Sequence, residues 1–229
     1  ELKESYPGLY YVDHSYGFTY DENGRILSFF PSYLMTENEV WHSREQIGKT
    51  LKSFKEQTDF LRSDGDKALY IHDFLARNFI YSPSGEENYD VYSLLKTGHG
   101  VCQAFSLLFI LLGHTIGLEA DMVTSDVMDH AWNHVKIDGY YYHVDVTRDL
   151  SSDSKEKYKF SHDRFLLCDE ALKLKGYEEY GCHHQHRCFQ MGFEVISEDG
   201  IMDNIFSNII GSSLFSDERW LALDDHGTL

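Results

Sequence analysis

Three side chains in this sequence have the chemistry of a nucleophile with its base: Cys102, His130 and Asp145, in that chain order. Cysteine attacks as a thiolate, and because its ordinary pKa is about 8.5, a catalytic cysteine needs a helix N-terminus or a cationic neighbour to ionise it. A histidine can take and return the proton, and an aspartate can fix the tautomer of that histidine. The surrounding elements must therefore bring these three residues together.

The segment after Gly98-His99-Gly100 predicts a helix that begins at Cys102. Apolar residues recur there at helical spacing, and a glycine suited to a helix end follows them: Phe105, Leu108, Leu112, Ile116 and then Gly117. The first turn of a helix carries unpaired N–H groups and the positive end of the helix dipole, and both favour an anion. The thiol would thus be favoured as a thiolate, and the same N–H groups could later hold an oxyanion.

The histidine and the aspartate lie on a predicted β-hairpin. Residues 130–137 and 140–147 are rich in aromatic and β-branched side chains, and Asp138-Gly139 between them is a preferred two-residue turn. Asp145 then becomes a diagonal neighbour of both His130 and His134, and the register alone does not choose between them. The predicted register places six side chains on one face of the sheet: His130, Trp132, His134, His143, Asp145 and Thr147.

These blocks resemble the transglutaminase-like superfamily, the papain-related group of bacterial cysteine hydrolases and animal transglutaminases. The resemblance implies that Cys102 is the nucleophile, His130 the base and Asp145 the residue that orients the base. His134 falls at a variable position of the motif. The matching segments are Gly-Val-Cys-Gln-Ala-Phe at 100–105, His-Ala-Trp-Asn at 130–133 and Tyr-His-Val-Asp-Val-Thr at 142–147.

Two further residues are candidates for the substrate and oxyanion side of the site. Gln103 follows the nucleophile and could reach the oxyanion, although it could equally face solvent. Trp132 could line the cleft, and a core position is its simplest interpretation. We expect no metal ion and no cofactor.

The resemblance extends over about residues 66–190. Residues 71–75 and Ile80-Tyr81 resemble the helix and short strand that lead into the cysteine, and residues 165–170 resemble a segment that follows the aspartate, with Cys168 in place of a serine. The implied fold class is α+β, a papain-like/transglutaminase core in which the nucleophile helix packs on an antiparallel β-sheet.

We divide the chain into three parts. Residues 1–62 are an N-terminal extension with a β-hairpin and a helix whose expected cap is Ser43, and residues 63–190 are the catalytic core. Residues 191–229 are a C-terminal extension, beyond which we expect the natural protein to continue.

The composition and the resemblance indicate which classes of partner and which location to expect. With 38 acidic and 20 basic residues the formal net charge is −18, which repels phosphate backbones and anionic membranes and disfavours a nucleic-acid-binding protein. The apolar stretch 101–118 carries no charged residue, but it contains Cys102, Gln103, Ser106, Gly113, His114 and Thr115 and fits a buried core helix better than a membrane span. We expect a protein or peptide substrate. The resemblance to exported bacterial members implies an extracellular or cell-surface location, with the cytoplasm as the alternative.

A second group of reactive side chains is the segment Cys-His-His-Gln-His-Arg-Cys at 182–188. Zinc binding is one interpretation, but the ligands are crowded into one short loop and match no familiar zinc spacing. A disulfide between Cys182 and Cys188 is the second, and it suits an exported protein. A loop that only borders the cleft is the third.

The sequence therefore predicts a thiol acyl-transfer enzyme that acts on amide or peptide bonds. Transfer of the thioester to water makes a peptidase or amidase, whereas transfer to a lysine amine makes a cross-linking transglutaminase. We expect hydrolysis, because the bacterial members that the sequence resembles are usually regarded as peptidase-like and no calcium-binding loop is evident. A non-catalytic binding module that keeps the fold is the remaining alternative.

Overall fold

The computed structural model of the chain describes residues 6–82, 89–151, 159–178 and 181–182. The extension predicted at 191–229 lies outside the described residues. So does the segment 182–188, of which the structure describes only the backbone of Cys182.

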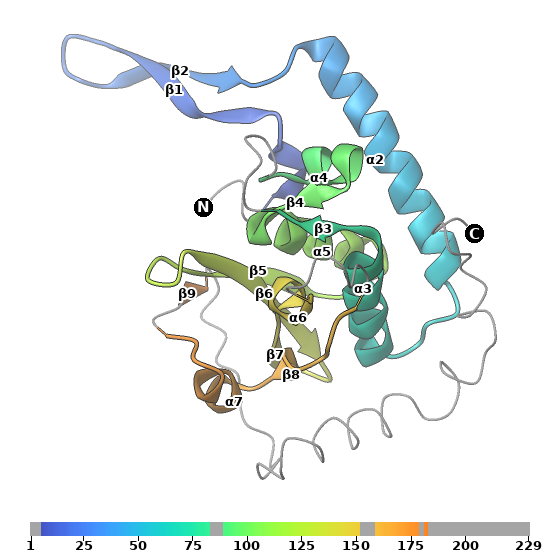
Figure 1. Cartoon of the computed structure of the whole chain (residues 1–229). Helices are drawn as coiled ribbons and strands as arrows, with labels where there is room; N and C mark the ends of the chain where they lie inside the picture. Colours follow the sequence, from blue (N-terminus) through green and yellow to red (C-terminus); the bar gives the residue numbers. More distant parts are fainter. Residues whose placement is uncertain (1–5, 83–88, 152–158, 179–180, 183–229) are drawn as a thin grey trace.

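An antiparallel sheet with the strand order β8-β7-β6-β5-β9 forms one layer of the core (Figure 1). Its two central pairings join β5 to β6 and β6 to β7, and the short β8 and β9 lie at its edges. The bounds are β5 Ala120–Ser125, β6 His130–Ile137, β7 Tyr140–Val144, β8 Phe165–Leu167 and β9 Gly181–Cys182. The α+β fold class with an antiparallel sheet is confirmed.

The helix α5 (Cys102–Thr115) is the centre of the core, and it begins at the predicted cysteine. It contacts β5 and β6 of the sheet and also α3 (Asp64–Asn78) and α4 (Val91–Thr97). All residues from Ala104 to Ile110 are buried, so the helix is buried on every face, as expected for a helix enclosed by other elements. Gly117 follows it with φ of +75°, in the left-handed conformation that the sequence predicted for this glycine.

The β6–β7 hairpin has the predicted turn and register. Asp138 and Gly139 both have positive φ, +51° and +86°, as a type I′ turn requires. The pairing runs from Ile137 opposite Tyr140 to Asn133 opposite Val144. The prediction that the second strand continues to residue 147 is wrong, because Asp145 leaves the strand and caps the one-turn helix α6 (Val146–Asp149).

The N-terminal part forms the predicted hairpin of β1 (Val12–Tyr20) and β2 (Ile26–Tyr33), which projects from the core (Figure 1). The 3-10 helix η1 (Pro7–Leu9) precedes it, and the long helix α2 (Glu37–Thr58) follows it. Aromatic side chains of the hairpin are exposed and contact one another: Tyr16, Phe18, Tyr20 and Phe29.

The predicted start of α2 is wrong. The helix begins after Thr36, which forms a reciprocal capping box with Glu39. Ser43 lies inside the helix and is fully buried, and its hydroxyl group is 2.6 Å from that of Tyr10 while donating to the carbonyl of Val40. The serine therefore joins the helix to the N-terminal segment and does not start it.

Within the described residues, no helix combines the length and the apolar character that crossing a membrane would require.

The central position of α5 predicts a large cost for a cavity within it. Leu108 is 0% exposed, so Leu108→Ala is expected to lower the free energy of unfolding by about 2–5 kcal/mol. Leu174 is 77% exposed, and Leu174→Ala is expected to change it by less than about 0.5 kcal/mol. Urea unfolding of both variants measures the difference, and similar losses would contradict the central position of α5.

Candidate active site

Cys102 is the first residue of α5, where the helix N-terminus is open. The N-cap residue, Val101, provides no side-chain hydrogen bond to the first turn. The preceding segment is held by a short parallel pairing of β3 (Ile80–Tyr81) with β4 (His99–Gly100), in which the N–H of Ser82 donates to the carbonyl of Gly100 at 2.9 Å. The thiol is thus partly exposed at a fixed position beside unpaired N–H groups.

His130 and Asp145 are in direct contact, which answers the question that the register left open. His130 Nε2 is 2.6 Å from Asp145 Oδ2. A carboxylate only accepts, so Nε2 carries the proton and donates it. His134 instead has its Nε2 at 3.2 Å from Nε2 of His143, its partner across the hairpin.

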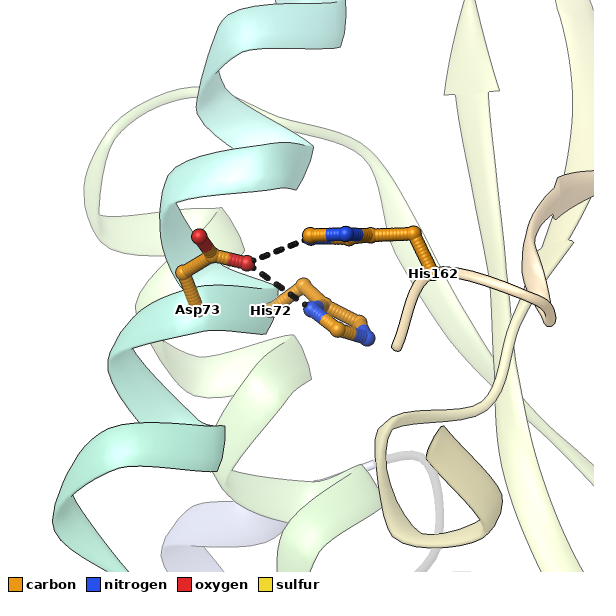
Figure 2. A group of neighbouring side chains, drawn as sticks. All are labelled: His72, Asp73 and His162. Carbon is orange, nitrogen blue, oxygen red and sulfur yellow. Dashed lines mark hydrogen bonds and ion pairs between the residues drawn. The ribbon is translucent and has the colours of Figure 1, made fainter. Parts of the chain in front are cut away.

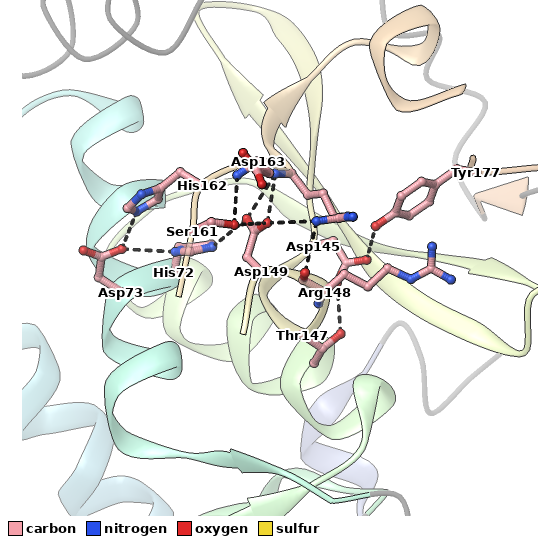
Figure 3. A network of polar contacts seen from close by, with 11 residues as sticks. His72, Asp73, Asp145, Thr147, Arg148, Asp149, Ser161, His162, Asp163 and Tyr177 are labelled. Atoms are coloured by element: carbon pink, nitrogen blue, oxygen red, sulfur yellow. Dashed lines mark hydrogen bonds and ion pairs between the residues drawn. The ribbon is translucent and has the colours of Figure 1, made fainter. Parts of the chain in front are cut away.

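Asp145 is a buried carboxylate whose two oxygens receive four hydrogen bonds. Oδ2 accepts from His130 and from the hydroxyl of Tyr177 at 2.5 Å. Oδ1 accepts from Thr147 Oγ1 at 2.9 Å and the N–H of Arg148 at 3.1 Å; Figure 3 shows Tyr177, Thr147 and Arg148 around this carboxylate. Burial by itself raises the pKa of Asp145, but the hydrogen bond and charge of His130, with the donors Tyr177 and Arg148, lower it overall. The carboxylate is therefore ionised at neutral pH.

His130 is correspondingly stabilised as a cation. Burial lowers its pKa, but the hydrogen bonds and charges of Asp145 and Cys102 outweigh burial and raise the pKa to about 9. Asp145 occupies Nε2, so Nδ1 is the ring nitrogen that remains for exchange of a proton with the thiol. The structure thus brings all three predicted residues together around one imidazole.

Trp132 is buried beside His130. It is 1% exposed, and its indole N–H, the only polar hydrogen of the side chain, donates to His143 Nδ1 at 2.9 Å. A contact of Trp132 with substrate or an oxyanion stays a prediction. The indole ring lies nearly parallel to the ring of His130, with centroids 5.7 Å apart, and so restricts the orientation of the imidazole.

Gln103 is partly buried in the first turn of α5, next to the cysteine. Its contact with an oxyanion stays a prediction.

Sequence reasoning missed Tyr177, which donates to the same carboxylate oxygen as His130. It lies 32 residues beyond Asp145, after α7 (Asp169–Leu174), and no motif links the two. Its ring meets that of Trp132 edge to face, with centroids 5.0 Å apart, and the guanidinium of Arg148 lies 4.6 Å from its centroid. Only the folded chain brings this tyrosine to the site.

Tyr81 is a second aromatic residue beside the cysteine. Its Cα is paired with that of Gly100, two residues before Cys102, and its side chain is 40% exposed. Burial raises its pKa, and the charges of Cys102 and Asp145 add to this effect, which places the phenol in the field of the site. The resemblance of Ile80-Tyr81 to a strand that precedes the cysteine was the available signal.

Residues 52–146 match the family model of the transglutaminase-like superfamily. Over this segment the chain is similar to that superfamily. The transglutaminase-like segment contains Cys102, His130 and Asp145, but ends before Tyr177.

Several solved structures are similar to this chain. A TGase crystal structure matches with a TM-score of 0.41 and 18% identity, over 52% of this chain and 35% of that one. A candidate cysteine protease from Cytophaga hutchinsonii matches with a TM-score of 0.38 and 23% identity, over 44% and 37% of the two chains. The chain thus spans about a third of the length of these proteins. No curated protein matches it in sequence.

The raised pKa of His130 predicts a pH-dependent stability. An unfolded histidine titrates near 6.5, so the contribution of His130 is present in full below about pH 6.5 and is lost as the pH rises through about 9. Relative to His130→Gln, the wild-type free energy of unfolding is expected to fall by up to roughly 3 kcal/mol over this window. Urea unfolding at several pH values measures it, and parallel pH profiles would contradict the pairing.

The hydrogen bond from Tyr177 predicts a second effect. Tyr177→Phe keeps the ring against Trp132 but leaves the buried Asp145 Oδ2 with one donor fewer, so a loss of about 1–3 kcal/mol of stability is expected. Tyr20→Phe is the control, because Tyr20 is 57% exposed and its hydroxyl should contribute less than about 0.5 kcal/mol. Equal effects of the two substitutions in urea unfolding would show that the bond to Asp145 adds nothing.

Proposed function

We propose that the protein is a thiol acyl-transfer enzyme that hydrolyses amide or peptide bonds through Cys102, His130 and Asp145. The observation that carries the proposal is the position of His130, which donates to the buried Asp145 at 2.6 Å and also interacts with the thiol at the start of α5. A cationic imidazole and a helix N-terminus are the two features that favour a thiolate.

Acylation starts with attack of Cys102 Sγ on the substrate carbonyl carbon. A carbon–sulfur bond forms, the carbonyl oxygen takes the negative charge, and the thiol proton resides on His130. The N–H groups of the first turn of α5 face the developing oxyanion, where each donor can contribute about 3 kcal/mol. His130 then gives its proton to the leaving nitrogen as the carbon–nitrogen bond breaks.

Deacylation returns the enzyme to its starting state. His130 accepts a proton from the attacking water, the oxygen of that water bonds to the thioester carbon, and Cys102 leaves as a thiolate. Asp145 holds the Nε2–H tautomer throughout, and Tyr177 and Thr147 keep the carboxylate oriented. We expect the enzyme to act outside the cytoplasm, as the resemblance to exported bacterial members implies.

Cys168 offers an internal comparison for the reactivity of Cys102. It caps α7 and is also partly exposed, so both cysteines stand at a helix N-terminus. The first turn of α7 carries Asp169 and Glu170, which oppose a thiolate, whereas the first turn of α5 carries no acid and has His130 nearby. The two cysteines therefore differ in the charges that surround the thiol.

Alkylation by iodoacetamide at neutral pH is expected to be much faster at Cys102 than at Cys168. In His130→Ala the rate at Cys102 should fall toward that at Cys168, because the cationic neighbour is gone. Peptide mass spectrometry of the native protein across about pH 4–10 measures both rates in one sample. Equal, slow labelling of the two thiols would refute an activated cysteine and favour a binding module.

The activity itself is tested with a peptide mixture in water enriched in oxygen-18. Cys102→Ala is expected to abolish turnover, and His130→Ala to lower kcat/KM by about a hundredfold or more. His134→Ala should cost far less, because its ring contacts His143 and not the catalytic aspartate. If the His134 substitution were the more damaging, the assignment of His130 as the base would be wrong.

The same experiment distinguishes water from a primary amine as the acceptor of the acyl group. Hydrolysis places oxygen-18 in new carboxyl termini or side-chain carboxylates, whereas transamidation incorporates a fluorescent primary amine and releases ammonia. Amine incorporation without oxygen-18 uptake would replace hydrolysis by cross-linking while keeping the same thioester.

A further inference from the structure

A second cluster of titratable side chains lies apart from the proposed catalytic residues, between α3 and the loop before β8. His72 and Asp73 are neighbours on α3, and His162 comes from the loop (Figure 2). Asp73 Oδ1 is 3.1 Å from His72 Nδ1 and 2.7 Å from His162 Nε2. One ligand-type atom of each residue lies within 4.8 Å of the other two.

The donor set of this cluster suits a divalent transition metal. Two imidazole nitrogens and one carboxylate oxygen, with a water in the fourth position, form a recurrent zinc site. Ligand atoms of tetrahedral zinc are ~3.3 Å apart, given bonds of ~2.0–2.1 Å. The observed 2.7 and 3.1 Å are somewhat shorter, so the side chains need to separate by about half an ångström to admit the ion.

The outer contacts of His72 are those that a metal ligand needs. Its Nε2 is 3.2 Å from Asp149 Oδ2, and both side chains are fully buried. A carboxylate on the far nitrogen keeps the proton there and turns the lone pair of Nδ1 toward the metal. Asp149 is itself held by Ser161 Oγ and the N–H of Arg164.

Access to the cluster comes from the side of Asp73 and His162. Their side chains are 9% and 18% exposed, whereas that of His72 is 0% exposed. An ion can therefore reach the three ligand atoms from solvent, and a water can complete its coordination.

A second group of similar composition does not offer a free nitrogen lone pair to a metal ion. It consists of His134, His143 and Asp169. The indole N–H of Trp132 donates to His143 Nδ1, and an indole nitrogen cannot accept. The neutral ring of His143 must then carry its proton on Nε2, the atom that faces Asp169 at 2.9 Å. A metal at Nε2 would displace this single N–H proton and leave the ring as an imidazolate, so this group is better described as a hydrogen-bond network.

We propose that His72 Nδ1, Asp73 Oδ1 and His162 Nε2 bind one zinc ion, which ties α3 to the loop before β8. The ion takes the place of the protons that now lie between these atoms. Through Asp149 it also supports α6, whose N-cap is Asp145 (Figure 3). The site is a structural clamp behind the proposed catalytic residues, and its occupancy does not depend on the proposed activity.

The test must separate this site from other residues with affinity for zinc. Cys102 with His130 is one competitor, and the segment 182–188 with its two cysteines and three histidines is another. The parent for the measurement is therefore the full chain with Cys102→Ala, freed of metal and loaded with Zn²⁺ or Co²⁺. Metal content is read by mass spectrometry after gel filtration.

His162→Gln is the decisive variant, because a glutamine amide can still donate to Asp73 but is a poor zinc ligand. It is expected to retain one equivalent of metal less than the parent. His42→Gln, at an exposed histidine of α2, should retain as much as the parent. Asp73→Asn, which keeps the size of the side chain, should lose the same equivalent as His162→Gln.

Two further readouts exclude a general loss of structure. Stoichiometric Zn²⁺ should raise the Tm of the parent and leave that of His162→Gln unchanged, with equal circular dichroism spectra for the two. The absorption spectra of the Co²⁺-loaded parent and His162→Gln should not differ in a sulfur-to-cobalt charge-transfer band, because the proposed site contains no cysteine ligand. Equal metal content in the parent and in His162→Gln would overturn the proposal. A parent that binds no metal would also overturn it. In either case the three residues would form only a network of hydrogen bonds.

Discussion

The candidate site depends on one buried carboxylate. Asp145 is 1% exposed and stands where β7 ends and α6 begins, so its charge has no water to solvate it. Such a charge is tolerated only when its oxygens are fully hydrogen-bonded. The donors that meet this need come from β6, from α6 and from the segment after α7. Satisfying Asp145 therefore specifies how these three parts of the chain sit around it.

The helix α6 connects Asp145 to other parts of the molecule through its hydrogen bonds. It is a single turn with a buried aspartate at each end, Asp145 as N-cap and Asp149 as its last residue. Asp149 accepts from the N–H of Arg164. It also lies 3.2 Å from Nε2 of His72 on α3 (Figure 3). An isolated helix of this length would not form in water, so its position rests on these contacts. The orientation of His130 thus also depends on contacts that α6 makes with α3 and with the segment before β8.

Cys102, the proposed nucleophile, is positioned by a different kind of constraint. Cys102 opens a helix that is buried on every side, and apolar packing holds that helix between the sheet, α3 and α4. The imidazole, in contrast, is oriented by polar groups and by the face of Trp132. The candidate site lies where an apolar core meets a hydrogen-bonded network.

Local chemistry accounts for what the sequence alone determined: the start of α5 at Cys102, the turn at Asp138-Gly139 and the register that brings Asp145 near His130. Each follows from periodicity, from a preferred turn or from a motif within a few residues. Sequence placed the start of α2 at Ser43 and extended the second strand of the hairpin to residue 147. Both errors arose because hydrogen bonds that sequence periodicity does not show fix these residues. The Ser43 hydroxyl is bonded to Tyr10, and the Asp145 carboxylate caps α6.

Only the tertiary structure decided which histidine meets Asp145, that Tyr177 shares this carboxylate, and that His72 and Asp73 meet His162. The last contact joins residues 89 positions apart. Side-chain patterns report the face on which a residue lies, but not which distant polar group will satisfy it once water is removed. That choice depends on the mutual burial of charges and donors, and it exists only in the folded chain.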